Sequence, residues 1–319
     1  MESSVGFGEE ATPLTSIDIG HGVVAAKLES QHPTASFKDR GTALLVNALR
    51  QAGVSRLVED SSGNAAASLA AYAARAGIPC TIYAPAAASA GKLLQANAFG
   101  AEVIRVDGSR AAVAAAAEHA HNPDQGVVYA SHNWHPWFVM GVATWALELW
   151  EQRGYRAPGA IVAPAGSGSL ILGAWTAFSL LLKSGAIEKM PALFAAQPAA
   201  CSPLVRALEL GRTETTPFDS QPTLAEGASI ANPVRGREVL EALRSSAGGA
   251  VAVSEDDIVQ ATLTAARQGI LVEPTSALAV AATTSLVQDG LVPPTTDTVL
   301  VVTGSGLKTQ STIATLLNR

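Results

Sequence analysis

The sequence predicts an α/β fold with parallel-rich twisted sheets flanked by helices, and three observations lead to it. Short β-branched runs alternate with Ala/Leu-rich stretches along nearly all of the 319-residue chain, which is typical of parallel sheets covered by helices. Hydrophobic residues make up 48% of the chain and charged residues 15%, which is sufficient for a large core. Glycines stand where helices need C-caps, at positions 53, 77, 100 and 185.

The individual elements follow from this alternation. Each expected strand is a short apolar run, and the strands are 56–60, 80–84, 102–106, 160–165 and 298–302. Helical patterns follow at 64–77, 91–100, 111–120 and 170–185. Residues 211–223 contain no periodic pattern. We expect them to form an irregular surface segment.

Charge and cysteine usage exclude several classes of function. The net charge is −6 with no run of Lys or Arg, which argues against nucleic acid or an anionic membrane as partner. The N-terminus lacks a secretory pattern, and no apolar run reaches the roughly 18 residues of a membrane span. Cys80 and Cys201 have no metal-type spacing, so we expect buried, reduced thiols. These features predict a cytoplasmic protein with a small-molecule ligand.

Lys38 stands at the start of a predicted helix in "HPTASFKDRG". Ser36 is the expected N-cap, and Asp39 completes a capping box three residues later. The positive end of a helix and partial burial both lower the pKa of a lysine and favour the neutral amine. A neutral amine is the form that makes a Schiff base, although an ordinary surface lysine fits the same letters.

Two further turns have the chemistry of an anion site. "SSGN" places Ser61, Ser62 and Asn64 at a helix start, where hydroxyls and N–H groups suit a carboxylate and Asn64 suits a ring hydroxyl. "AGSGSL" at 165–170 offers successive N–H groups to a phosphate. Taken alone, the "SSGN" motif is also explained by Ser62 as a helix N-cap, and the "AGSGSL" motif by an ordinary tight turn.

A fourth turn, "TGSGLK", follows the last apolar strand. Thr303 should stand at the carboxyl end of that strand, where its hydroxyl gives a ring nitrogen no counter-ion and so favours the unprotonated state. A lysine, a phosphate cradle, a carboxylate cradle and a hydroxyl for a ring nitrogen together predict pyridoxal phosphate as the cofactor.

The ordered motifs resemble those of threonine synthases and their relatives, which are fold type II pyridoxal-phosphate enzymes of the tryptophan synthase β-like kind. The motifs are "ATPL", "HPTASFKDRG", "SSGN", "KLLQANAFGAEV", "AGSGSL", "LVEPTSALA" and "TGSGLK", and they extend over nearly the whole chain. The family implies two domains with the active site in the cleft between them. We expect a larger cofactor-binding domain of residues 1–37 and 145–319 and a smaller mobile domain of residues 38–144. The resemblance also implies a homodimer.

The resemblance implies a role for each motif residue. Lys38 would carry the cofactor in a Schiff base and move the α-proton, Asn64 would contact the ring hydroxyl, and Thr303 would bond the pyridine nitrogen. The residues around the cofactor phosphate would be Gly166, Ser167, Gly168, Ser169 and Leu170. The substrate carboxylate would lie on Ser61, Ser62 and Gly63.

One segment departs from the family pattern. Many threonine synthases hold the substrate phosphate with Asn-Ser-x-Asn-Pro-x-Arg, and in "HNWHPWFVMG" Phe138 stands where that arginine would fall. Arginine grips a phosphate with two charged hydrogen bonds, and phenylalanine does not. Asn133 and His135 remain as candidate substrate-binding donors, and charge from Arg235 or Arg237 is an alternative. The aromatic residues of this segment are as well explained by an apolar core or gate.

Two smaller questions stay open at the level of sequence. Glu273, before Pro274, is either a helix-capping carboxylate or a group near the cofactor. His132 and His135 have no third ligand nearby, so no metal site is expected.

The predicted activity is that of a carbon–oxygen lyase of amino-acid biosynthesis that converts O-phosphohomoserine to threonine and phosphate. The alternative is β-elimination or β-replacement on another hydroxy- or phospho-amino acid, as in dehydratases or cysteine synthases. A degenerate relative that only binds a ligand is a third hypothesis, against which the joint presence of Lys38, Asn64 and Thr303 argues.

Overall fold

The computed structural model describes residues 4–318, which fold as two compact units. The first unit contains residues 4–10 and 32–142, and the second contains 11–31 and 143–318. Residues 4–10 and 32–37 thus fold with the first unit, and residues 143 and 144 with the second. The expected division into a larger cofactor-binding domain of residues 1–37 and 145–319 and a smaller mobile domain of residues 38–144 stays a prediction.

The first unit contains a four-stranded parallel sheet in the order β5-β4-β3-β6. Its strands are β3 (Arg56–Glu59), β4 (Cys80–Pro85), β5 (Glu102–Val106) and β6 (Val127–Tyr129). The chain moves outward from β3 through β4 to β5 and then returns to place β6 on the other side of β3. The strand order therefore reverses between β3 and β6, which is where open parallel sheets bind ligands.

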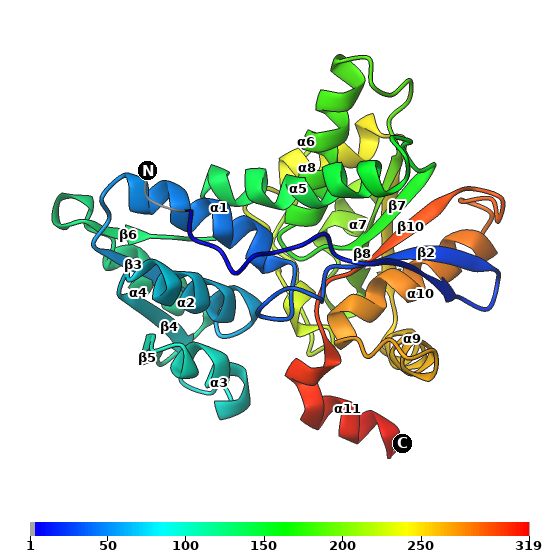
Figure 1. The fold of residues 1–319 in the computed structure, drawn as a ribbon. Helices are drawn as coiled ribbons and strands as arrows, with labels where there is room; N and C mark the ends of the chain where they lie inside the picture. The colour runs from blue at the N-terminus through cyan, green and yellow to red at the C-terminus, as the bar shows by residue number, and fades with distance from the viewer. Residues whose placement is uncertain (1–3, 319) are drawn as a thin grey trace. The chain divides into compact units, whose positions relative to one another are not determined.

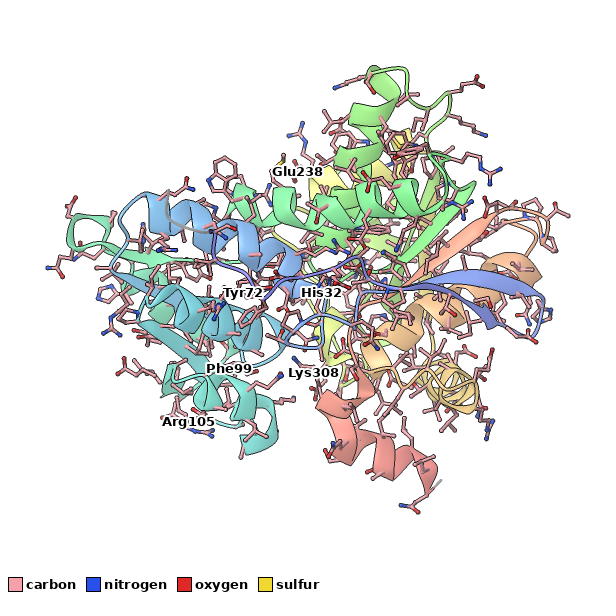
Figure 2. The ribbon with its side chains drawn as sticks, in the orientation of Figure 1. His32, Tyr72, Phe99, Arg105, Glu238 and Lys308 are labelled. Carbon is pink, nitrogen blue, oxygen red and sulfur yellow. The ribbon has the colours of Figure 1, made fainter. Side chains whose placement is uncertain are left out.

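Helices cover this sheet, and those of residues 64–76 and 110–119 are rich in alanine. They are α1 (Lys38–Gln51), α2 (Asn64–Ala76), α3 (Ala90–Ala98), α4 (Arg110–His119), the 3₁₀ turn η1 (Pro123–Gln125) and the beginning of α5 (Pro136–Gln152). Helix α2 packs against α1 and α3, and nine consecutive residues from Ala65 to Ala73 are buried. Tyr72, labelled in Figure 2, lies among them and donates a hydrogen bond to Glu9. Small side chains allow this close helix packing.

The second unit contains a six-stranded sheet in the order β1-β2-β10-β7-β8-β9. Its strands are β1 (Leu14–Asp18), β2 (Val23–Leu28), β7 (Ala160–Pro164), β8 (Ala192–Pro198), β9 (Gly249–Val253) and β10 (Thr298–Val302). Only the β1–β2 pair is antiparallel. The order reverses between β7 and β10, so this sheet also has a switch point.

Helices lie on both sides of the second sheet. They are the remainder of α5, α6 (Ser169–Lys183), α7 (Pro203–Glu209), α8 (Gly236–Ser245), α9 (Glu255–Arg267), α10 (Pro274–Gln288) and α11 (Gln310–Leu317), with 3₁₀ turns η2 (Ala199–Cys201), η3 (Glu226–Ala228) and η4 (Gly306–Thr309). Figure 1 shows α6 and α8 on one side of the strands and α9 and α10 on the other. Every residue of β7 and β10 is buried, as expected for parallel strands covered on both faces.

The expected strands and helices are present in the structure. All five predicted strands form, and the four predicted glycines adopt the left-handed conformation that a helix end requires, with φ between 69° and 82°. Cys80 and Cys201 are buried free thiols, as predicted. Residues 211–223 are irregular and mostly exposed. Among residues 4–318, no helix has both the length and the apolar character needed to span a membrane.

Candidate active site

Lys38 is the first residue of α1, but the helix is capped differently from the sequence prediction. The N-cap is Phe37 rather than Ser36, and no side chain of the described residues caps the helix. Asp39 is instead bound by the preceding turn, through the backbone N–H of Thr34 at 2.7 Å and its hydroxyl at 2.6 Å. The prediction of a capping box is therefore wrong. The Asp39 carboxylate instead binds Thr34, in the turn that precedes the helix. Burial raises the pKa of Asp39.

Aromatic rings border the Lys38 ammonium. Its Nζ lies 4.9 Å from the ring centre of Phe37 and 5.5 Å from that of Phe138, both within cation–π range. Lys38 is half-buried, whereas Phe138 is only 1% exposed. Among the aromatic residues of its segment, Phe138 is a core residue, while Trp134 and Trp137 are 57% and 47% exposed.

A buried acid–histidine pair that the sequence did not single out lies near Lys38. Glu59 ends β3, and its Oε1 is 2.9 Å from Nδ1 of His132, while Oε2 accepts the His132 backbone N–H at 3.3 Å. Burial raises the pKa of Glu59 to about 7, partly opposed by a hydrogen bond with Asp60 and by the Lys38 charge. Burial also holds the pKa of His132 well below 6.5, and the Lys38 charge acts in the same direction.

Asp60 extends this buried cluster toward α4. Its carboxylate accepts a 2.6 Å hydrogen bond from the Tyr129 hydroxyl and forms a 2.7 Å ion pair with Arg110. Burial and the neighbouring Glu59 raise the pKa of Asp60, whereas Arg110 lowers it. The sequence contained one signal of this cluster, because "RLVED" ends a predicted strand with two carboxylates directly before "SSGN".

The "SSGN" turn connects β3 to α2. Asn64 is the first residue of α2, and its N-cap is Gly63 rather than Ser62. No side chain of residues 4–318 caps this helix, and the Ser61 hydroxyl accepts the Gly63 N–H at 3.3 Å. The simple assignment of Ser62 as the N-cap is thus wrong. The half-buried side chains of Ser61, Ser62 and Asn64 stand at the carboxyl end of β3.

Asn133 and His135 follow β6. Both side chains are half-buried. The backbone N–H of Asn133 donates to the Ser131 hydroxyl at 3.3 Å, and the backbone N–H of His135 donates to the Ser131 carbonyl at 3.0 Å. Burial lowers the pKa of His135. The predicted residues of the first unit therefore gather at α1 and at the carboxyl ends of β3 and β6, which are neighbours at its switch point.

In the second unit, the "GSGS" turn leads from β7 into α6. Gly168 has φ +80°, and a Cβ there would lie 2.3 Å from Cγ2 of Val239. At Gly166 a Cβ would meet the backbone of Gly227 and Ala228 at 3.0 Å. Glycines are therefore required for this turn to pack against its neighbours. The 15-residue helix starts at Ser169, and within the described chain no side chain caps it.

Thr303 directly follows the neighbouring strand β10 and is 2% exposed. Its hydroxyl lies 2.9 Å from that of Ser276 and 3.3 Å from Oε1 of Glu273. Glu273 occupies the N-cap position of α10 but makes no side-chain cap bond among the described residues. Of the two roles left open for Glu273, capping is thus wrong, and its carboxylate lies beside Thr303. Because β7 and β10 are paired, Thr303 and the "GSGS" turn share one sheet edge.

These residues fit the chemistry of pyridoxal phosphate within each unit. The first N–H groups of α6 have no acceptor inside the helix and no side-chain cap in the described residues, which suits a phosphate. The buried Thr303 hydroxyl suits a ring nitrogen that stays unprotonated. Lys38 supplies an amine at a helix start. Among residues 4–318, no group of three His, Cys, Asp or Glu is arranged to hold a metal ion.

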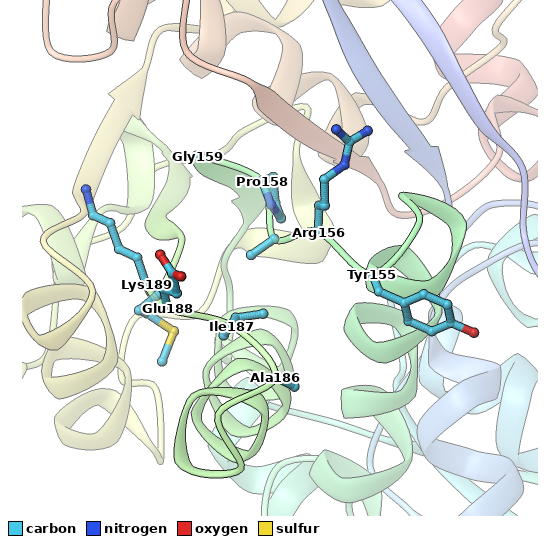
Figure 3. Close-up of a pocket in the computed structure, with 10 residues that line it drawn as sticks. Tyr155, Arg156, Pro158, Gly159, Ala186, Ile187, Glu188 and Lys189 are labelled. Atoms are coloured by element: carbon cyan, nitrogen blue, oxygen red, sulfur yellow. The ribbon is translucent and has the colours of Figure 1, made fainter.

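A surface pocket of about 490 Å³ lies elsewhere in the second unit (Figure 3). Its lining comes from the segments that precede β7 and β8, including Arg156, Ile187 and Lys189. Because the amino ends of parallel strands lie at the opposite edge of the sheet from their carboxyl ends, this pocket lies at the other edge from the "GSGS" turn and Thr303. None of the predicted site residues lines this pocket.

Comparisons with known proteins agree with this chemistry. Residues 5–304 match the family model described as "Pyridoxal-phosphate dependent enzyme". The threonine synthase of Methanocaldococcus jannaschii is 33% identical over 91% of this chain and 72% of its own, and that of Methanosarcina acetivorans is 32% identical over 96% and 76%. A threonine deaminase of known structure, from T.th., superposes with a TM-score of 0.78 at 28% identity, over 93% of this chain and 92% of the other. An L-serine ammonia-lyase from Rhizomucor miehei, at 22% identity, has a TM-score of 0.83 over 97% and 98%.

Proposed function

The chain belongs to the family of pyridoxal-phosphate dependent enzymes, and we propose that it converts O-phosphohomoserine to threonine and phosphate. The observation that carries this proposal is Lys38 at the start of α1, in a chain whose threonine synthase relatives match more than nine-tenths of its length. The half-buried lysine provides the amine that the cofactor requires, and two aromatic rings border it.

Lys38 would hold the cofactor covalently, and Asn64 at the start of α2 would contact its ring hydroxyl. The hydroxyl of Thr303, which follows β10, would form a hydrogen bond with the ring nitrogen. The phosphate would lie on the turn that opens α6, formed by Gly166, Ser167, Gly168, Ser169 and Leu170. When bound, pyridoxal phosphate supplies an electron sink that stabilises negative charge on the substrate carbons.

The chain's own groups would then bind the substrate and move its protons. The hydroxyls of Ser61 and Ser62 and the N–H of Gly63 would hold its carboxylate near the start of α2, where the helix dipole favours an anion. The Lys38 amine would remove the proton from the α-carbon and return protons later in the reaction. Asn133 and His135 remain the proposed donors to the distal part of the substrate.

A second candidate is β-elimination or β-replacement on another hydroxy- or phospho-amino acid. Phe138 favours it, because this buried ring stands where many threonine synthases have the arginine that grips the substrate phosphate. The 28% identity to a threonine deaminase of known structure supports the same alternative. Arg235, the alternative source of charge, lies 3.8 Å from Glu238 on α8.

The first experiment tests whether Lys38 binds the cofactor. Protein reconstituted with pyridoxal phosphate should be yellow, and Lys38→Ala should lose the absorbance band of the lysine-bound cofactor. Lys183→Ala, which removes an exposed lysine at the end of α6, is the matched control and should keep the band. A colourless wild-type protein would contradict the proposal.

The second experiment decides the reaction. O-Phosphohomoserine should give phosphate and threonine in equal amounts. Serine, threonine and phosphoserine should be supplied in parallel, with keto acids measured as the products of elimination. Formation of keto acids without threonine from any substrate would replace the main proposal by the second candidate.

We also propose a cytoplasmic homodimer, in keeping with the acidic composition and the two buried free thiols. Sedimentation analysis of the purified protein measures the subunit number. Fractionation of source cells measures the location.

A further inference from the structure

Arg110 brings a positive charge to the carboxyl edge of the sheet in the first unit. It is the first residue of α4, which follows β5, yet its Nη2 lies 2.7 Å from Oδ2 of Asp60, which directly follows β3. Strand β4 lies between β5 and β3 in the sheet, so the arginine side chain extends along the ends of the strands. Asp60 directly precedes the "SSGN" turn, and the guanidinium group therefore lies close to that turn.

The Asp60 carboxylate fixes the position of this guanidinium group. The Asp60 side chain is 4% exposed, and its two oxygens have different partners, the Tyr129 hydroxyl at 2.6 Å from Oδ1 and Arg110 at Oδ2. The arginine side chain itself is 50% exposed. A guanidinium group has five N–H donors in one plane, of which a carboxylate accepts at most two side by side. Arg110 therefore offers oriented, water-accessible donors to a further ligand.

The charge of Arg110 acts on the ends of both β3 and β6. Burial dominates the pKa values of Glu59 and His132, and the positive charge of Arg110 lowers both. The hydroxyl that shares the carboxylate with Arg110 belongs to Tyr129, the last residue of β6, and Asn133 follows four residues later. Arg110, the "SSGN" turn and the segment after β6 thus belong to one edge of the sheet, at its switch point.

The carboxyl groups at this edge do not exclude an anion. Burial raises the pKa of Glu59 to about 7, so below that pH its carboxyl group is neutral. The negative charge of Asp60 is shared between a hydroxyl donor and the guanidinium group. An anion that binds the outer donors of Arg110 therefore meets a carboxylate that already has two partners.

We propose that Arg110 binds the phosphate group of the substrate and that Asp60 positions it. This inference rests on the proposed function, whose substrate has a carboxylate for the "SSGN" turn and a phosphate that needs a cation of its own. Arginine matches a phosphate with two parallel charge-assisted hydrogen bonds. Because Asp60 already restricts the arginine side chain, binding loses less conformational entropy. The assignment favours a phosphorylated amino acid over a hydroxy-amino acid as the substrate.

The first test measures inorganic phosphate binding to the holoenzyme, in which the cofactor occupies its own phosphate site. Calorimetry should detect binding to the wild-type protein, and Arg110→Gln should weaken it about 10- to 100-fold, as expected for the loss of charged hydrogen bonds. Arg110→Lys, which keeps the charge without the planar fork, should weaken it less. Arg56→Gln is the matched control, because Arg56 forms an exposed ion pair with Glu102 at the amino end of β3, and it should bind phosphate like the wild type. Absence of binding to the wild type, or equal affinities of wild type and Arg110→Gln, would overturn the inference.

A matched pair of ligands separates this inference from the proposed reaction. Phosphoserine and serine differ only in the phosphate, and their affinities are measured through the absorbance change of the bound cofactor. Arg110→Gln should weaken phosphoserine far more than serine, whereas equal losses would assign Arg110 to the carboxylate and overturn the inference. If the wild-type protein forms no threonine but Arg110→Gln loses phosphate affinity, the proposed reaction is wrong and the inference stands.

A further measurement needs no variant. Phenylglyoxal modifies accessible guanidinium groups, and inorganic phosphate should slow the modification of Arg110 in the wild-type holoenzyme, measured by mass spectrometry of peptides. The modification of Arg56 should not change. Equal modification of Arg110 with and without phosphate would overturn the inference even if Arg110→Gln fails to fold.

Discussion

The ring of Phe138 lies so close to Gly41 that a Cβ built on the glycine would meet three ring carbons at 2.6 to 2.8 Å. Gly41 follows Lys38 by three residues on α1, so both face the same side of the helix. The missing side chain is what allows the phenylalanine ring to lie over the lysine. Phe138 is therefore part of the helix packing that shapes the lysine site.

Gly41→Ala should destabilise the protein in spite of the better helix propensity of alanine. The propensity gain is about 1 kcal/mol, whereas forcing a side chain into a filled core costs roughly 1–3 kcal/mol. We expect a net loss, measured by urea unfolding, with a change in the environment of Lys38. Gly91→Ala in α3 is the control, because its Cβ would meet nothing within 4 Å, and it should not destabilise. Equal effects of the two substitutions would contradict this packing argument.

The Glu59–His132 pair predicts an unusual pH dependence of stability. Between pH 4.5 and 6.5 the unfolded pair has its proton on histidine and the folded pair has its proton on Glu59, whose pKa is raised from 4.5 to about 7. Since both states bind one proton, the pair contributes no slope in this range.

Glu59→Gln exposes the histidine contribution alone. The folded pKa of His132 is lowered, so its contribution is present above pH 6.5 and is lost as the pH falls. The unfolding free energy of the variant should therefore fall relative to wild type as the pH drops below 6.5, by at most about 1.4 kcal/mol per pH unit. His132→Gln should have the opposite slope and lose stability as the pH rises toward 7. Parallel wild-type and variant profiles would count against this assignment.

Ser276 is predicted to orient Thr303. Its hydroxyl accepts the Gly304 N–H at 2.8 Å and lies 2.9 Å from the Thr303 hydroxyl. Ser276→Ala leaves that buried N–H without its acceptor, which costs roughly 1–3 kcal/mol. We also expect weaker cofactor affinity, measured by titrating apo-protein with pyridoxal phosphate. Ser285→Ala, on the same helix but bonded only to the helix carbonyl of Ala281, should retain normal affinity.

A network of hydrogen bonds around a buried lysine should contribute strongly to the stability of the second unit. Lys27 is fully buried, and its Nζ donates to the Thr12 carbonyl at 2.7 Å, to Gln152 at 2.8 Å and to Glu148. Glu148→Ala removes one half of a buried ion pair, so unfolding should become easier by about 3–5 kcal/mol. The double variant Lys27→Met, Glu148→Leu should be less destabilised than the single variant. Additive losses in thermal unfolding would argue against a charge effect.

Local signals in the sequence were sufficient for part of the secondary structure and for the chemistry at the ends of those elements. The β-branched runs predicted the five strands β3, β4, β5, β7 and β10, because strand and helix periods differ over a few residues. They did not predict β1, β2, β6, β8 and β9. The turns "SSGN", "GSGS" and the turn at Thr303 were found because glycines and hydroxyl residues directly after a strand have few structural alternatives. Lys38 was found because it stands at a helix start. In the first unit "SSGN" follows a strand at the sheet's switch point, and in the second unit "GSGS" and Thr303 do so.

The tertiary structure decided which side chains meet. Asp39 bonds Thr34 rather than capping α1, because the chain before the helix folds back onto the carboxylate. Glu59 meets His132 only because β6 pairs with β3. Sequence therefore determined the cofactor class through local backbone chemistry, whereas strand order and packing, which depend on distant residues, determined the charged surroundings of Lys38.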